Sequence, residues 1–192
     1  MSFDDYKAVI RPLLGDKRYY HSICVARAAK ELAGQCGADK QKAETAGILH
    51  DIMKDIPSEK QLEMMNQYGI KLSPVERSAQ KLWHAMLGSA YLKNELHIDD
   101  PEILDAVRYH TTGRENMTTM DKVLFVADFI SADRNYPGVE NLRKAAKIGL
   151  NEAVMEGLSY TIADLAQNRK AIHPDTIAAF NQEALAFAGD KS

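Results

Sequence analysis

The chain has 192 residues, a length typical of one domain. Hydrophobic residues make up 45% of it and charged residues 27%, which is usual for a globular protein with a sizeable core and excludes disordered and fibrous chains. Twenty-four Lys and Arg against 27 Asp and Glu give a formal net charge of -3. That balance argues against a dedicated nucleic-acid-binding domain, because such domains usually carry a strong basic excess.

The sequence carries no sign of export or of a membrane anchor. Its two cysteines, Cys24 and Cys36, do not make a disulfide framework. Residues 1–5 lack the basic and then apolar layout of a signal peptide. No run of about 18 apolar residues is present, so no membrane span is expected. We therefore expect a soluble, cytoplasmic protein.

Apolar residues recur at helical spacing along nearly the whole chain. The first run ends at Gly15, the second ends near Gly34 or Gly37, and Pro57 ends the third. In chain order the pattern predicts helices over residues 6–14, 23–33, 40–53, 59–68, from 74 onward, 84–96, from 101 toward 110, 118–132, 140–165 and 174–188.

Two of these helices begin with a clear N-terminal signal. Ser73 stands three residues before Glu76, and Thr118 stands three residues before Asp121, as in a capping box. The sequence shows no alternating strand pattern, no flexible linker and no internal repeat. It therefore predicts an all-α fold, a compact single domain over residues 1–192.

The adjacent pair His50-Asp51 directly follows the apolar residues 46–49. Burying a carboxylate is costly unless it is paired or bound to a cation. Adjacent residues on a helix point about 100° apart, so the two side chains could flank one metal ion. A surface pair or a capped helix end would also explain this dipeptide, which is a weak signal when taken alone.

Asp128 lies in the otherwise apolar run 123–130, which contains no Lys or Arg to pair with it. Lys122, six residues earlier, points elsewhere. His21 lies early in an Ala-rich helix. Metal ligation accounts together for His21, His50, Asp51 and Asp128. Such a mixed nitrogen and oxygen set suits iron, manganese or another hydrolytic divalent metal better than a structural zinc.

The order His21, His50-Asp51 and Asp128 resembles the H…HD…D signature of the HD-domain metal-dependent phosphohydrolases. Segments 48–54, 106–114, 121–128 and 172–176 are similar to those of its YqeK-like branch, the symmetrical bis(5′-nucleosyl)-tetraphosphatases. The resemblance runs from about His21 to Thr176. It implies a helical HD-domain fold and an enzyme that cleaves diadenosine tetraphosphate into two ADP by metal-activated water.

The resemblance also implies roles for individual residues within a metal-site core over about residues 18–134. The implied metal ligands are His21, His50, Asp51 and Asp128. They would hold one or two ions, with iron expected and manganese or another divalent metal as the alternative. His84 and His110 would face the same site, where they bind a second metal or contact phosphate. The implied catalytic residues are Asp51, Lys54, His84 and His110.

Helices over residues 140–188 would close the nucleotide pocket. Lys54 lies about one helical turn from Asp51, and Arg18 about one turn from His21, so both should project toward the site. The residues implied to contact substrate or ADP are Arg18, Lys54, His84, Tyr109, His110, Asp133, Arg134, Lys170, Ala171, Ile172, His173, Pro174 and Asp175.

The expected partners are a dinucleoside polyphosphate substrate and its ADP product, with no nucleic acid and no membrane. A homodimer formed through helical surfaces such as the last helix is plausible. His97, which has no motif support, is expected at the surface. Two other functions stay open: an HD-domain phosphohydrolase acting on nucleoside monophosphates or deoxynucleotides, and a non-catalytic ADP-binding regulatory protein.

Overall fold

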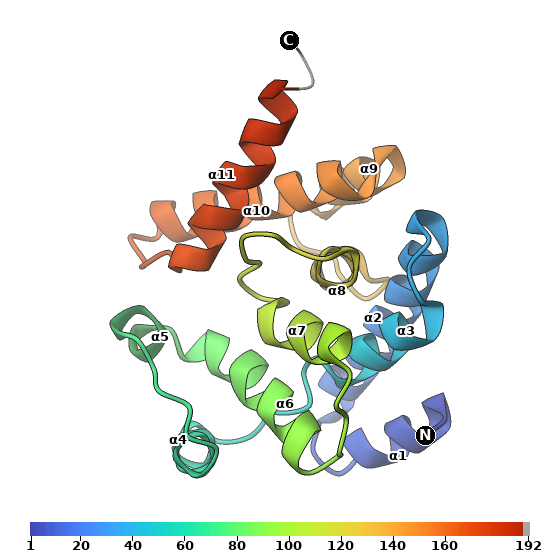
Figure 1. The fold of residues 1–192 in the computed structure, drawn as a ribbon, viewed down its shortest axis with the longest axis vertical. Helices are drawn as coiled ribbons and strands as arrows, with labels where there is room; N and C mark the ends of the chain where they lie inside the picture. Colours follow the sequence, from blue (N-terminus) through green and yellow to red (C-terminus); the bar gives the residue numbers. More distant parts are fainter. Residues whose placement is uncertain (190–192) are drawn as a thin grey trace.

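The computed structural model describes residues 1–189, and every regular element within that range is helical (Figure 1). The all-α prediction is therefore confirmed. The helices are α1 (Phe3–Ile10), α2 (Asp16–Cys36), α3 (Lys40–Leu49), α4 (Ser58–Gln67), α5 (Pro74–Ser78), α6 (Trp83–Asn94), α7 (Pro101–Tyr109), α8 (Thr119–Ile130), α9 (Val139–Ile148), α10 (Leu150–Gln167) and α11 (Pro174–Gly189). A short 3-10 helix, η1 (Gln80–Leu82), precedes α6.

The predicted capping boxes form at the starts of α5 and α8. The Ser73 hydroxyl accepts a hydrogen bond from the backbone of Glu76 at 3.3 Å, and the Glu76 carboxylate accepts one from the backbone of Ser73 at 2.7 Å. Thr118 and Asp121 make the same exchange at 3.1 and 2.9 Å. Each exchange satisfies two backbone donors that the first helical turn would otherwise leave unpaired.

The centre of the molecule is formed by α3 and α8. Helix α2 packs along α3 and across α8, α7 lies against α3 and α8, and α6 packs on α7. Ile48 and Leu49 at the end of α3 and Phe125 in α8 are fully buried. The polar residues that follow Leu49 and Phe125 are therefore held by the most tightly packed part of the chain.

Four predicted helices differ clearly from those observed. The first two are Phe3–Ile10 and Asp16–Cys36, where the pattern predicted 6–14 and 23–33. Helix α3 ends at Leu49, not at residue 53, and tight turns follow it, with the Lys54 N–H bonded to the Asp51 carbonyl at 2.8 Å. The single helix predicted over residues 140–165 is two helices, α9 and α10. Gly149 between them has an extended backbone (φ 179°, ψ 165°), which interrupts the helical hydrogen-bond ladder.

The last helices form a second layer on the molecule. Helix α10 packs against α8, α9 and α11, and α11 projects away from the other helices at its C-terminal end (Figure 1). None of the helices described in residues 1–189 combines the length and the apolar character that crossing a bilayer requires.

Candidate metal centre

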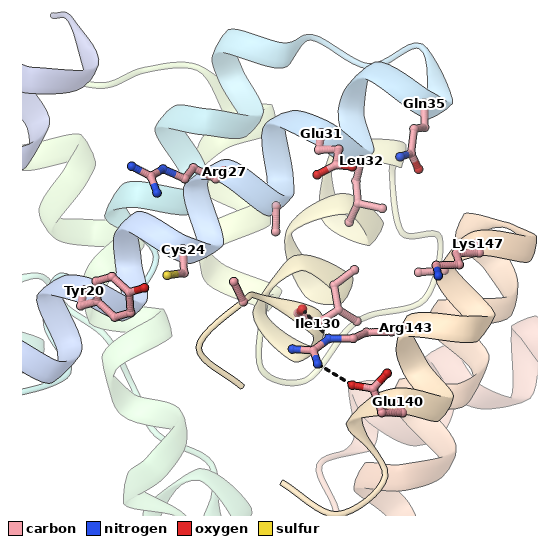
Figure 2. Close-up of a pocket in the computed structure, with 13 residues that line it drawn as sticks. Tyr20, Cys24, Arg27, Glu31, Leu32, Gln35, Ile130, Glu140, Arg143 and Lys147 are labelled. Atoms are coloured by element: carbon pink, nitrogen blue, oxygen red, sulfur yellow. Dashed lines mark hydrogen bonds and ion pairs between the residues drawn. The ribbon is translucent and has the colours of Figure 1, made fainter. Parts of the chain in front are cut away.

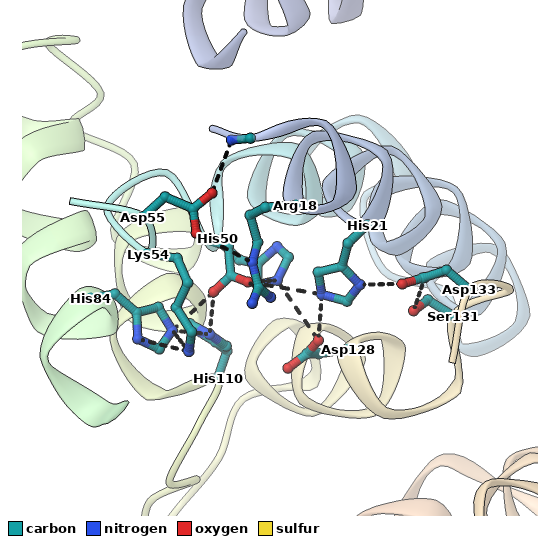
Figure 3. A network of polar contacts seen from close by, with 12 residues as sticks. Arg18, His21, His50, Lys54, Asp55, His84, His110, Asp128, Ser131 and Asp133 are labelled. Atoms are coloured by element: carbon teal, nitrogen blue, oxygen red, sulfur yellow. Dashed lines mark hydrogen bonds and ion pairs between the residues drawn. The ribbon is translucent and has the colours of Figure 1, made fainter. Parts of the chain in front are cut away.

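His21 projects from α2 toward two carboxylates (Figure 3). Its Nδ1 lies 2.8 Å from Asp133 Oδ2, and its Nε2 lies 3.0 Å from Asp128 Oδ1. If Nδ1 donates its proton to Asp133, the neutral ring has a lone pair on Nε2. That lone pair and the Asp128 carboxylate then face the same point in space, where a cation would satisfy both.

His50 and Asp51 follow the last residue of α3. His50 Nδ1 donates to the Gly47 carbonyl at 2.7 Å, which leaves the lone pair on Nε2. This Nε2 is fully buried and has no hydrogen-bond partner among the described residues. It lies 3.5 Å from Asp51 Oδ2 and 3.8 Å from Asp128 Oδ1. A buried nitrogen lone pair facing two carboxylates fits a metal ligand.

His84 from α6 and His110 at the end of α7 lie on the other side of Asp51. His110 Nδ1 donates to the Val107 carbonyl at 2.7 Å, so the neutral ring can only accept at Nε2. His84 Nε2 lies 3.1 Å from that atom and 2.9 Å from Asp51 Oδ1, so the proton between them belongs to His84. Burial lowers the pKa of His84 to about 4, which keeps its ring neutral near pH 7.

Both aspartates of the cluster are ionised and each is paired with an arginine. Burial raises the pKa of Asp51, but the neighbouring His50 and His84 outweigh it and hold that pKa well below the ordinary value. For Asp128 the contact with His21 and the charge of Arg134 do the same. Arg18 Nη1 lies 2.6 Å from Asp51 Oδ2, and the Arg134 guanidinium contacts Asp128 Oδ1.

The structure thus brings together the side chains that were predicted as metal ligands. Three groups each have nitrogen and oxygen atoms within 4.8 Å of one another. These groups are His21, His50 and Asp51; His50, His110 and Asp128; and Asp51, His84 and His110. The buried donor set, with each Nδ1 of His21, His50 and His110 next to a protein oxygen, fits one or two divalent ions.

Lys54 lies beside this cluster and is partly exposed to solvent. Its Nζ is 3.2 Å from His84 Nδ1, which is free to accept because the His84 proton is on Nε2. Burial lowers the pKa of Lys54, while the charge of Asp51 opposes that shift. An ammonium group that is largely removed from water, next to the cluster, is well placed to attract a phosphate.

A cavity of about 370 Å³ opens next to the cluster, and its walls include Arg18, His21, Asp133 and Arg134. Lys17 also lines it, as do Gly15, Asp16 and Asp55. Sequence reasoning did not single out Asp55, although it lies four residues after Asp51. Its carboxylate accepts from the backbone of Gly15 at 2.9 Å and so joins the start of α2 to the turn after α3.

The segment from Lys170 to Asp175, predicted to line a nucleotide pocket, begins α11 next to α5 and α7. His173 Nε2 lies 3.5 Å from Glu76 Oε1, and Arg108 Nη2 lies 3.3 Å from the same oxygen. Lys170, Ala171 and Pro174 are exposed. Tyr109 follows Arg108 and lies under the guanidinium of Arg114, 4.6 Å from the ring centre. Glu76 therefore links this segment to the end of α7, which carries His110.

Comparisons with known proteins identify the class to which this fold and site belong. A family model of the HD domain matches residues 18–133. The chain therefore belongs to the HD domain family. A solved structure from Clostridium acetobutylicum, described as a predicted HD superfamily hydrolase involved in NAD metabolism, matches with a TM-score of 0.92 at 35% identity. The match covers 97% of this chain and 98% of that one.

Two relatives show to which branch of the HD domain family the chain belongs. The symmetrical bis(5′-nucleosyl)-tetraphosphatase of Halalkalibacterium halodurans is 38% identical, over 91% of this chain and 92% of its own length. The protein of the same name from Bacillus subtilis is 36% identical, over 94% of this chain and 97% of its own length. Within the HD domain family the chain belongs to the symmetrical bis(5′-nucleosyl)-tetraphosphatases, which confirms the resemblance seen in the sequence.

Proposed function

We propose that this protein hydrolyses diadenosine tetraphosphate symmetrically, releasing two ADP, with iron held at the histidine–aspartate cluster. The observation that carries the proposal is His50 Nε2, buried and without a hydrogen-bond partner among the described residues, facing the carboxylates of Asp51 and Asp128. The relatives, which are symmetrical bis(5′-nucleosyl)-tetraphosphatases, support the substrate and the position of cleavage.

The donors fit a hydrolytic divalent metal. His21, His50, Asp51 and Asp128 would hold one ion, and His84 and His110 with Asp51 could hold a second. A bound metal supplies a Lewis acid that lowers the pKa of water and offsets charge on phosphoryl oxygens. Neutral imidazoles with carboxylates suit iron and manganese, and of these two metals we propose iron.

Three cations would bind the polyphosphate. Arg18 and Arg134 now pair with Asp51 and Asp128, the same carboxylates that would hold a metal. A metal on those oxygens would compete with the guanidinium groups, which could then bind phosphate through paired N–H donors. Lys54, held beside His84, adds a third positive charge.

Where only one ion is bound, the pair of histidines next to Asp51 would handle protons. His84 carries its proton on Nε2, between Asp51 Oδ1 and His110 Nε2. Asp51 or Asp128 would orient the attacking water or accept its proton, and His84 or His110 would return a proton to the leaving phosphate. ADP is a good leaving group, so the return step needs little help.

The nucleoside of one product would lie toward the start of α11. We propose that Lys170–Asp175, together with Tyr109, line this part of the pocket and that the helices from residue 140 onward close it. The Glu76 carboxylate, shared by Arg108 and His173, supports this arrangement because it ties that segment to α7.

Chromatography of the products from diadenosine tetraphosphate tests the proposal, using protein purified without oxygen and analysed for its metals. Wild type should yield ADP alone, and Asp128→Asn should lose at least a hundredfold in rate.

AMP together with ATP would overturn symmetrical cleavage. Free phosphate from nucleoside monophosphates, with no reaction of the dinucleotide, would favour a different HD phosphohydrolase. Binding of ADP without turnover in iron or manganese would identify a non-catalytic protein.

A further inference from the structure

A second and larger cavity, of about 590 Å³, lies between α2 and α9 and is not used by the mechanism above (Figure 2). From α2 its wall includes Tyr20, Cys24 and Arg27, and from α9 it includes Arg143 and Lys147. The volume lies within the range of about 300–1,000 Å³ that small-molecule sites usually have.

This cavity adjoins the one beside the metal cluster. Tyr20 lines the larger cavity and the next residue, His21, lines the smaller one. In the same way, Ala132 lines the larger cavity and the next residue, Asp133, lines the smaller one. Asp133 also acts electrostatically on both Tyr20 and Cys24. The two cavities are therefore neighbours, and the contact between His21 and Asp133 lies at the boundary between them.

The smaller cavity is lined by groups of both charges. Its three carboxylates, Asp16, Asp55 and Asp133, already have partners in Arg11, the Gly15 backbone and His21. Lys17, Arg18 and Arg134 all line the smaller cavity. A polyphosphate chain that leaves the cluster on this side would pass these three cations. Opposite charges on the polyphosphate and on these side chains attract one another at close range.

The larger cavity has the features that hold a nucleoside. The Tyr20 side chain is 57% exposed and offers a ring on which a base can stack. Leu32 and Ile130 add apolar wall. Arg143 is held in place, because its guanidinium pairs with Glu140 and donates to the backbone carbonyls of residues 130, 131 and 134. Gln35 and Lys147 at the other end can bond to a base or a sugar.

We propose that this cavity, between α2 and α9, binds the second nucleoside of the dinucleotide substrate. The inference rests on the proposed function. Cleavage at the central bridge places that bridge at the metal, so each nucleoside is separated from it by two phosphates. The two halves must then leave the cluster in different directions, and Lys17, Arg18 and Arg134 of the neighbouring smaller cavity could bind the phosphates of the half that extends toward Tyr20. The site is thereby specific for a substrate with a nucleoside at both ends.

The test compares kcat/KM for diadenosine tetraphosphate with kcat/KM for adenosine 5′-tetraphosphate, which lacks the second nucleoside. Wild type should prefer the dinucleotide. Tyr20→Ala should reduce that preference about tenfold, because base stacking on the ring is lost. Lys147→Glu should also reduce it. Lys144→Glu, an exposed position on the same helix that does not line the cavity, makes the same charge change and should leave it intact.

The outcomes separate this inference from the proposed function. Equal preference in Tyr20→Ala, Lys147→Glu and wild type, with diadenosine tetraphosphate still cleaved to ADP, would overturn the second nucleoside site alone. A wild type that hydrolyses neither compound would overturn the proposed function and the inference together. Loss of preference confined to the two cavity variants would establish the site.

Discussion

At the scale of single residues, three histidines of the cluster share one arrangement. Nδ1 of His50 and of His110 donates to a backbone carbonyl in the same helix, and Nδ1 of His21 faces the Asp133 carboxylate. Each of these contacts fixes the tautomer and turns Nε2 toward the centre of the cluster. The aspartate differs from the two carbonyls because it can be changed by mutation without altering the backbone.

Asp133 should therefore support metal binding without touching the metal. We expect Asp133→Ala to weaken the binding of Mn²⁺ by about 10- to 100-fold, because His21 would lose the partner that orients its ring. Asp133→Asn keeps a hydrogen-bond acceptor and should recover part of the affinity. Calorimetric titration measures the affinity, and far-UV circular dichroism checks the fold. Asp164→Ala, an exposed carboxylate outside the site, is the control. Wild-type affinity in Asp133→Ala would contradict this role.

Glu76 should make a pH-dependent contribution to the free energy of unfolding. Burial raises its pKa, but hydrogen bonds from Ser73, together with Arg108 and His173, lower it below the ordinary value. A lowered pKa means that the ionised form favours the folded state. The contribution is therefore complete above the ordinary pKa of about 4.3 and is lost as the pH falls through the folded-state value.

Glu76→Gln tests this contribution, because glutamine can keep the capping box while it loses the charge. The free energy of unfolding should fall by about 1 kcal/mol at pH 7. The difference from wild type should shrink as the pH is lowered below 4. Urea denaturation at pH 7 and pH 3.5 measures both values, with the exposed Glu63→Gln as control. A difference that is the same at both pH values would exclude the charge as its source.

At the scale of elements, the close contact of α2 and α3 positions two of the proposed metal ligands. Gly47 in α3 lies against the backbone of Ala26 in α2, where a Cβ atom would come within 2.6 Å of the Ala26 Cα. His21 lies on α2, and His50 follows α3 by one residue. The separation of these two ligands therefore depends on a contact that only glycine allows.

Gly47→Ala should push the two helices apart. We expect a loss of about 1–3 kcal/mol in the free energy of unfolding, as for other overpacked cores, together with weaker metal binding. Gly34→Ala is a matched control in α2, since its Cβ would meet only the flexible end of Lys40 and alanine favours helix. Chemical denaturation and metal titration of both variants give the two quantities. Equal stability of Gly47→Ala and wild type would show that α2 and α3 can adjust at no cost.

The sequence predicts elements well where the signals are local. The capping boxes at Ser73 and Thr118 lie within three residues of their partners, and both form. The break at Gly149 was missed because the residues on both sides of it are good helix formers, although glycine itself is not. The end of α3 at Leu49 was missed because apolar residues continue at helical spacing beyond it, while the His50 ring bonds back to the Gly47 carbonyl at the last turn of the helix.

At the scale of the whole molecule, the cluster joins parts of the chain that are distant in sequence. His21 and Asp128 are 107 residues apart, yet their side chains meet at 3.0 Å. Helical periodicity cannot predict such a contact. The grouping came from carboxylates in apolar runs that need a cation, and then from the order of His and Asp residues that resembles the HD domain. That pattern does not show that Asp133 contacts His21, nor does it show the cavity between α2 and α9. Both depend on how the helices pack.

Because the proposed ligands come from five separate elements, metal binding should stabilise the entire fold. They lie on α2 and α8, in the turn after α3, on α6 and at the end of α7. A ligand that binds only the folded state raises the free energy of unfolding by about 2.7 kcal/mol when its concentration is 100 times its Kd. For a chain of this length the thermal midpoint should rise by about 5–10 °C in Mn²⁺.

Thermal unfolding followed by circular dichroism, with metal and after treatment with a chelator, measures this shift. Asp128→Asn should lose most of the shift, because one carboxylate that faces both His21 and His50 no longer carries a charge. His97→Asn removes an exposed histidine outside the cluster, at a positive φ of 52° that asparagine tolerates, and should keep the whole shift. An equal rise in midpoint for Asp128→Asn and His97→Asn would place the stabilising metal somewhere other than between α2, α3 and α8.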